Sequence, residues 1–86
     1  MRTLRSQLRV DCQEAAALTA WLRDDAHELL MCMDAGACEH ALSDIEECEA
    51  DARRALKDAT TTSEQLARLR HALRDAVEVV TWELAK

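Results

Sequence analysis

Proline is absent from this 86-residue chain, and glycine occurs only once, at Gly36. These two residues are the ones that most often interrupt helices, so their scarcity leaves long helices open to the chain. Ala, Leu, Arg and Glu are abundant and favour the helical backbone, whereas β-branched residues are few and scattered. The sequence therefore predicts an all-α fold, and its length fits one small domain over residues 1–86.

Apolar residues recur at steps of three and four through three segments, which predicts helices at about 2–33, 37–59 and 63–85. Gly36 is expected to end the first helix in a left-handed conformation. Thr62 with Gln65, or Thr61 with Glu64, forms a capping-box pattern that begins the third helix. Because both turns are short, consecutive helices should be antiparallel, and the predicted architecture is an antiparallel three-helix bundle.

The first predicted helix is the longest, and its N-terminal third would extend beyond the other two. Leu4 and Leu8 would then be uncovered, and exposed leucines at helical spacing usually mark an interface. A homodimer formed through this overhang is the simplest expectation, and packing of the overhang on another protein is the other. The alternative is a break near residue 11, where Asp11 and Glu14 could cap a second helical segment.

Two further apolar residues, Val79 and Trp82, lie off the main inward stripe of the third predicted helix. They are either the edge of the core or a second self-association surface, since Trp is enriched at binding hot spots. Cys12 and Cys48 occupy inward helical positions and are expected to pack there as reduced thiols.

The segment 24–52 contains no Lys or Arg, although it holds ten carboxylates. An acidic helix face is often only a solvated surface, but selection for stability alone would normally intersperse Lys. A partner with a basic surface would relieve the repulsion and be steered to it. The predicted partner-binding residues are Asp24, Asp25, Glu28, Glu39, Asp44, Glu47 and Asp51.

Sulfur and imidazole side chains cluster in the same part of the chain. Zn²⁺ and Cu⁺ favour such donors, but the paired spacings C-x2-C and H-x3-H are missing. Packing of these side chains is therefore expected, and no metal or other cofactor is predicted. The candidates for a metal- or thiol-sensing alternative are His27, Cys32, Cys38 and His40.

Charge and motifs argue against several classes of function. A net charge of −6 disfavours direct binding to nucleic acid or to an anionic membrane, and no apolar run is long enough to span a bilayer. Phosphate-binding loops, nucleophile elbows and zinc-protease motifs are missing, so no enzyme is predicted. No signal-peptide pattern is visible, and a cytoplasmic protein is expected.

In size, charge and fold class the chain is similar to small acidic helical proteins of bacteria and phages that inhibit a larger protein. That resemblance has no motif behind it. The leading hypothesis is a protein-binding module that inhibits or modulates a basic partner, for example nucleic-acid-handling machinery. The alternatives are the metal- or thiol-sensing regulator and a structural helical subunit of an assembly.

Overall fold

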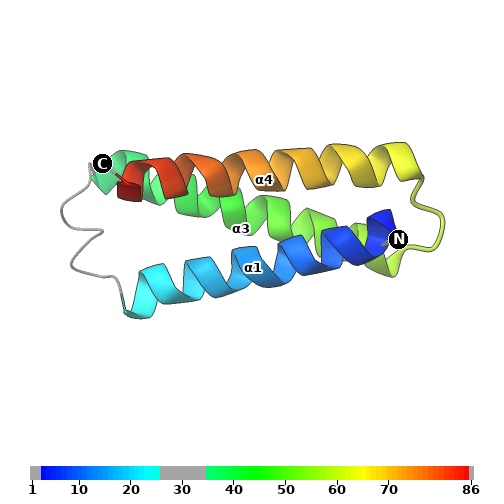
Figure 1. Cartoon of the computed structure of the whole chain (residues 1–86), viewed down its shortest axis with the longest axis horizontal. Coiled ribbons are helices and arrows are strands. Elements are labelled where there is room, and N and C mark those ends of the chain that lie inside the picture. Colours follow the sequence, from blue (N-terminus) through cyan, green and yellow to red (C-terminus); the bar gives the residue numbers. More distant parts are fainter. Residues whose placement is uncertain (1–2, 26–34, 86) are drawn as a thin grey trace.

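The computed structural model of the protein describes residues 3–25 and 35–85, with the side chains of 35–38 excepted. Within that part the chain forms three helices and no strand: α1 (Leu4–Asp24), α3 (Ala35–Lys57) and α4 (Ser63–Ala85). Each helix packs against the other two, and consecutive helices are antiparallel, in a bundle measuring 42 × 21 × 19 Å (Figure 1). The predicted all-α antiparallel three-helix bundle is confirmed.

The first helix differs most from its prediction. α1 has 21 residues, runs without a break through residue 11, and ends at Asp24, whereas α3 and α4 have 23 residues each. It is therefore not the longest helix, and the predicted end at residue 33 is wrong. Residues 26–34 lie outside the described part of the chain. The predicted range 63–85 for the third helix is confirmed.

Gly36 also differs from its prediction. It lies in the first turn of α3, not in a turn that ends the first helix, and the described glycine backbone shows no positive φ. Glycine permits the left-handed conformation but does not require it. The local pattern therefore could not decide on which side of Gly36 the helix would begin.

The core consists of the inward stripes of the three helices. Leu8 is fully buried, and Leu4 packs against the same cluster, because the C-terminal half of α3 and the N-terminal half of α4 cover this end of α1. The predicted uncovered overhang is therefore wrong, and Leu8 has no exposed side chain to form a self-association surface. Self-association of the protein stays a prediction. The buried apolar residues are Leu8, Cys12, Ala15, Leu22, Leu42, Ile45, Ala52, Leu66, Leu73 and Val80.

The turn between α3 and α4 is closed by local hydrogen bonds. The Thr62 amide donates to Gln65 Oε1 at 2.9 Å, and the Gln65 amide donates to Thr62 Oγ1 at 3.2 Å, which confirms the predicted capping box. Asp58 Oδ1 accepts from both the amide and the hydroxyl of Thr60. These two hydrogen bonds hold the pKa of the Asp58 carboxyl below its ordinary value.

Arg5, near the start of α1, forms hydrogen bonds to the turn between α3 and α4. Its guanidinium donates to the carbonyl oxygens of Leu56 (3.3 Å), Asp58 (3.1 Å) and Thr61 (3.3 Å). The last carbonyls of a helix lack intrahelical partners and carry partial negative charge, so a cation is well placed here. Arg5 thus links the start of α1 to the end of α3 and to the turn before α4.

Candidate protein-binding surface

Charge is distributed unevenly along the bundle axis. We call residues 14–25, 35–47 and 75–85 the acidic end, and residues 3–13 and 48–74 the turn end; Figure 1 shows them at opposite ends of the long axis. The acidic end carries ten carboxylates and one arginine, a net charge of −9 with histidine neutral. The turn end carries five carboxylates and eight Lys and Arg residues, a net charge of +3. The bundle is therefore an electric dipole along its long axis.

Ion pairs accumulate at the turn end. Asp11 of α1 and Arg70 of α4 meet at 2.8 Å across the bundle, with side chains only 15% and 27% exposed. On single helices, Arg53 pairs with Glu49, Arg54 with Asp51, and Arg68 with Glu64. All but one of the carboxylates at this end are consequently neutralised by a cation nearby, and Asp58 is held by Thr60.

Among the described residues of the acidic end, one carboxylate forms an ion pair with an arginine. Glu46 of α3 pairs with Arg23 of α1 at 2.7 Å. Five of the seven predicted partner-binding residues lie at this end. They are exposed and make no ion pair with the described part of the chain: Asp24, Asp25, Glu39, Asp44 and Glu47. Asp51 instead lies at the turn end, paired with Arg54, and Glu28 is outside the described residues.

The helix dipoles do not account for these acidic charges. α1 and α4 both end at the acidic end, and the C-terminus of a helix carries partial negative charge that favours cations. The last turn of α4 nevertheless holds no basic residue among those described, and α1 ends in Asp24 and Asp25. Asp24 and Asp25 are therefore placed against the field of α1, which is a pattern that stability by itself would not select. α3 begins at this end, so its dipole does not oppose the carboxylates that it carries here.

Two large apolar side chains are exposed on α4 at the same end. Val79 is 55% exposed and Trp82 is 61% exposed, and the two lie one helical turn apart. They border an open hollow of about 610 Å³ together with three carboxylates, those of Asp75, Glu78 and Glu83. Asp75 also lies 3.3 Å from His71 Nε2. We call these five hollow-lining residues the α4 patch.

The prediction named Val79 and Trp82 but missed the carboxylates around them. The signal was present in the sequence, because acidic residues flank both apolar ones within a single turn of a helix. The helix also contains Arg68, Arg70 and Arg74, so its acidic residues do not stand out as a segment without cations. The structure adds that the acidic side chains of α3 and the α4 patch share one end of the bundle.

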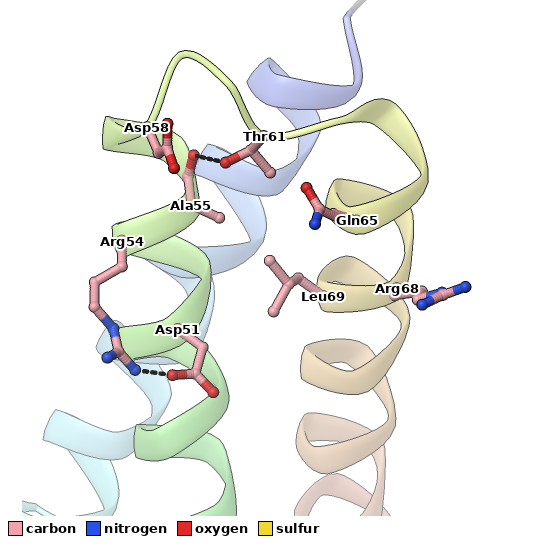
Figure 2. Close-up of a pocket in the computed structure, with 8 residues that line it drawn as sticks. All are labelled: Asp51, Arg54, Ala55, Asp58, Thr61, Gln65, Arg68 and Leu69. Carbon is pink, nitrogen blue, oxygen red and sulfur yellow. Dashed lines mark hydrogen bonds and ion pairs between the residues drawn. The ribbon is translucent and has the colours of Figure 1, made fainter.

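A second hollow, of about 530 Å³, lies between α3 and α4 at the turn end. Figure 2 shows Leu69 pointing into the space between the helices and Arg68 pointing away from it. Its charged groups are already engaged: Arg54 with Asp51, Arg68 with Glu64, and Asp58 with Thr60. This hollow therefore offers a ligand little charge that is not already neutralised.

The sulfur and imidazole candidates do not assemble in the described part of the chain. His40 is exposed on α3, the side chain of Cys38 is not described, and His27 and Cys32 lie outside the described residues. No group of three or more His, Cys, Asp or Glu side chains suited to a metal occurs among the described residues. The prediction about a metal- or thiol-sensing site stays open.

Cys12 and Cys48 pack as predicted, one buried in the core and the other against it. Burial is the main cause that raises the pKa of each thiol above its ordinary value, and nearby carboxylates raise it further. Both thiols are therefore protonated at neutral pH. Because the thiolate is the reactive form, these two side chains are poor nucleophiles.

Comparison with family models, characterised proteins and solved structures gives no match to this chain. None of the described helices has the length and apolar character needed to cross a bilayer.

Proposed function

We propose that the protein is a non-enzymatic binding module whose acidic end docks on a basic surface of a larger protein and blocks or modulates it. One observation carries this proposal: five carboxylates are exposed at one end and form no ion pair with the described residues, namely those of Asp24, Asp25, Glu39, Asp44 and Glu47. Each is exposed, so each can exchange water for an Arg or Lys of a partner without breaking an ion pair to the described part of the chain.

The dipolar charge distribution supports a steering role. A concentrated field of one sign raises the rate of encounter with an oppositely charged surface and orients the approach. The opposite end of the bundle is net positive, so it would be repelled by the same surface. A basic partner would thus meet the acidic end first, and the remaining length of the 42 Å bundle would project from the complex and obstruct it.

The class of target follows from the same chemistry. Surfaces rich in Arg and Lys are common where proteins contact nucleic acid, since they neutralise phosphates. An acidic protein on such a surface would exclude the nucleic acid by occupying the same cations. We therefore propose nucleic-acid-handling proteins as the first class of partner to test.

The test is capture of partners from the native host with the wild-type protein and with the neutralised variant Glu39→Gln/Asp44→Asn/Glu47→Gln. We expect specific partners to be lost with the variant, because the charges that hold them are gone. Binding should also weaken steeply between about 0.1 M and about 1 M salt, where the Debye length falls from about 10 Å to about 3 Å. Circular dichroism of the variant should match that of the wild type.

A matched control distinguishes an effect of the local acidic surface on partner binding from an effect of net charge. Gln13→Lys/Ala50→Lys/Ala67→Lys changes the net charge by the same amount at exposed helix positions outside the acidic cluster. This control should retain the partners. Equal loss in both variants would show that only net charge matters, and equal retention would show that the three carboxylates are not the docking surface.

A further inference from the structure

α4 carries more apolar surface than its packing requires. Its inward face is complete, with Leu66, Leu73 and Val80 buried and further apolar side chains packed around them. Val79 and Trp82 lie outside that face and remain more than half exposed. Exposed apolar area of this kind, rimmed by polar groups, is typical of a binding site.

The carboxylates of the α4 patch surround this apolar ridge. Successive residues of an α-helix are rotated by about 100°, so Glu78 and Glu83 fall on opposite sides of the ridge formed by Val79 and Trp82. Asp75 lies one turn before Val79 along the ridge. The patch therefore spans about two turns and consists of an apolar strip about one turn long with negative charge on both sides and at one end.

Charge decides between the possible occupants. In a symmetric dimer formed through this patch, each copy would place Asp75, Glu78 and Glu83 against the same carboxylates of the other copy. Like charges brought together in this way oppose association. An anionic membrane surface is disfavoured for the same reason. A partner that has both apolar and basic side chains, in contrast, can cover the apolar strip and form ion pairs with the carboxylates around it.

We propose that the α4 patch binds an amphipathic helix of the partner, with apolar side chains seated on Val79 and Trp82 and Lys or Arg residues paired with the flanking carboxylates. This inference rests on the proposed function and specifies the segment that the acidic end recognises. Two apolar anchors one turn apart on α4 match the three- and four-residue spacing of apolar side chains on a partner helix. The burial of the strip supplies affinity, and the acidic rim selects a basic helix over an acidic one.

Three synthetic helical peptides test the proposal. The first has Leu at three- and four-residue steps with Lys elsewhere, the second replaces each Lys by Glu, and the third replaces each Leu by Ala. The full chain carries Trp21→Phe, so that Trp82 is its only tryptophan. We expect the Leu/Lys peptide alone to shift the Trp82 emission to the blue, because only that peptide both meets the rim and buries the indole.

Calorimetry with variants of the full chain then locates the contact. Val79→Ser/Trp82→Ser should weaken binding of the Leu/Lys peptide by about tenfold or more, equivalent to about 1.4 kcal/mol. Trp21→Ser is the matched control, since it removes a partly exposed tryptophan outside the patch, and it should leave the affinity unchanged. Circular dichroism checks that each variant remains folded.

The outcomes separate this inference from the proposed function. If binding of the Leu/Lys peptide is lost in Glu39→Gln/Asp44→Asn/Glu47→Gln but unchanged in Val79→Ser/Trp82→Ser, the acidic surface stands and the α4 patch is not its anchor. Equal shifts with the Leu/Glu peptide, or no binding of any peptide, would overturn the inference without affecting the capture experiment. A wild-type dimer that becomes monomeric in Val79→Ser/Trp82→Ser would show that the occupant is a second copy.

Discussion

The two ends of this bundle use the same kinds of residue for different purposes. At the turn end, Arg5 binds three carbonyl oxygens and Asp11 meets Arg70 between helices. At the acidic end, one such pair, Arg23 with Glu46, joins two helices, and most carboxylates there face solvent. The difference indicates that polar interactions between helices are concentrated at the turn end, whereas the carboxylates of the acidic end remain largely exposed.

The comparison also explains how a small bundle can carry an unfavourable charge cluster. Exposed ion pairs contribute little, so the acidic end loses little stability by lacking them. The core runs the length of the bundle and includes buried side chains at both ends, such as Leu8 near the turn and Leu22 near the acidic end. Burial therefore holds the acidic end together although its surface charges repel one another.

The largest expected effect separates core from surface. Leu8→Ala should lower the free energy of unfolding by about 2–5 kcal/mol, because it removes a fully buried side chain and leaves a cavity. Trp82→Ser, at an exposed site of the acidic end, should change it far less. Urea denaturation followed by circular dichroism measures both. A small effect of Leu8→Ala would mean that α1 is not packed as described.

An intermediate effect is expected at Arg5. Arg5→Ala should lower the free energy of unfolding by about 1–2 kcal/mol, since the carbonyls at the end of α3 lose a charged donor. Arg5→Lys should recover only part of this, because a single ammonium cannot reach as many acceptors as a guanidinium. Arg9→Ala, an exposed position on the same helix, is the control. If Arg9→Ala and Arg5→Ala cost the same, the contacts of Arg5 contribute nothing specific.

The smallest expected changes in the free energy of unfolding have opposite signs at the two ends of the bundle. Asp24→Lys should raise the free energy of unfolding by about 0.3–1 kcal/mol, because a cation suits the C-terminus of α1 and no longer repels Asp25. Glu64→Lys should lower it by a similar amount, since Glu64 lies in the first turn of α4 and pairs with Arg68. Both changes should shrink in high salt. Destabilisation by Asp24→Lys would contradict the view that the acidic end is not optimised for stability.

Much of the fold was predictable because its signals are local. The capping box of Thr62 and Gln65 and the inward stripe of α4 depend on residues a few positions apart, and both are confirmed. The end of α1 was not predictable, because the apolar spacing continues past Asp24 and no glycine or proline stands there. The error in length produced the error about Leu4 and Leu8, since the supposed overhang followed from helix lengths alone.

For the candidate surface, too, local features were predictable from the sequence, whereas contacts between helices were not. Helical periodicity correctly placed Asp44 and Glu47 on the outside of α3. It could not show that Glu46 meets Arg23, because that contact joins residues far apart in the sequence and depends on how α1 lies against α3. Nor could it show that the C-terminal half of α4, which contains Val79 and Trp82, lies at the same end of the bundle as the N-terminal half of α3 (Figure 1).

By itself, the sequence determined the helical class, the inward stripes and the density of negative charge, because helix formation and amphipathicity are set by neighbours within two turns. The tertiary structure decided which carboxylates are neutralised and which remain exposed without an ion pair among the described residues. Ion pairs such as Asp11 with Arg70 require two helices in one register, and that register follows from packing of the whole core.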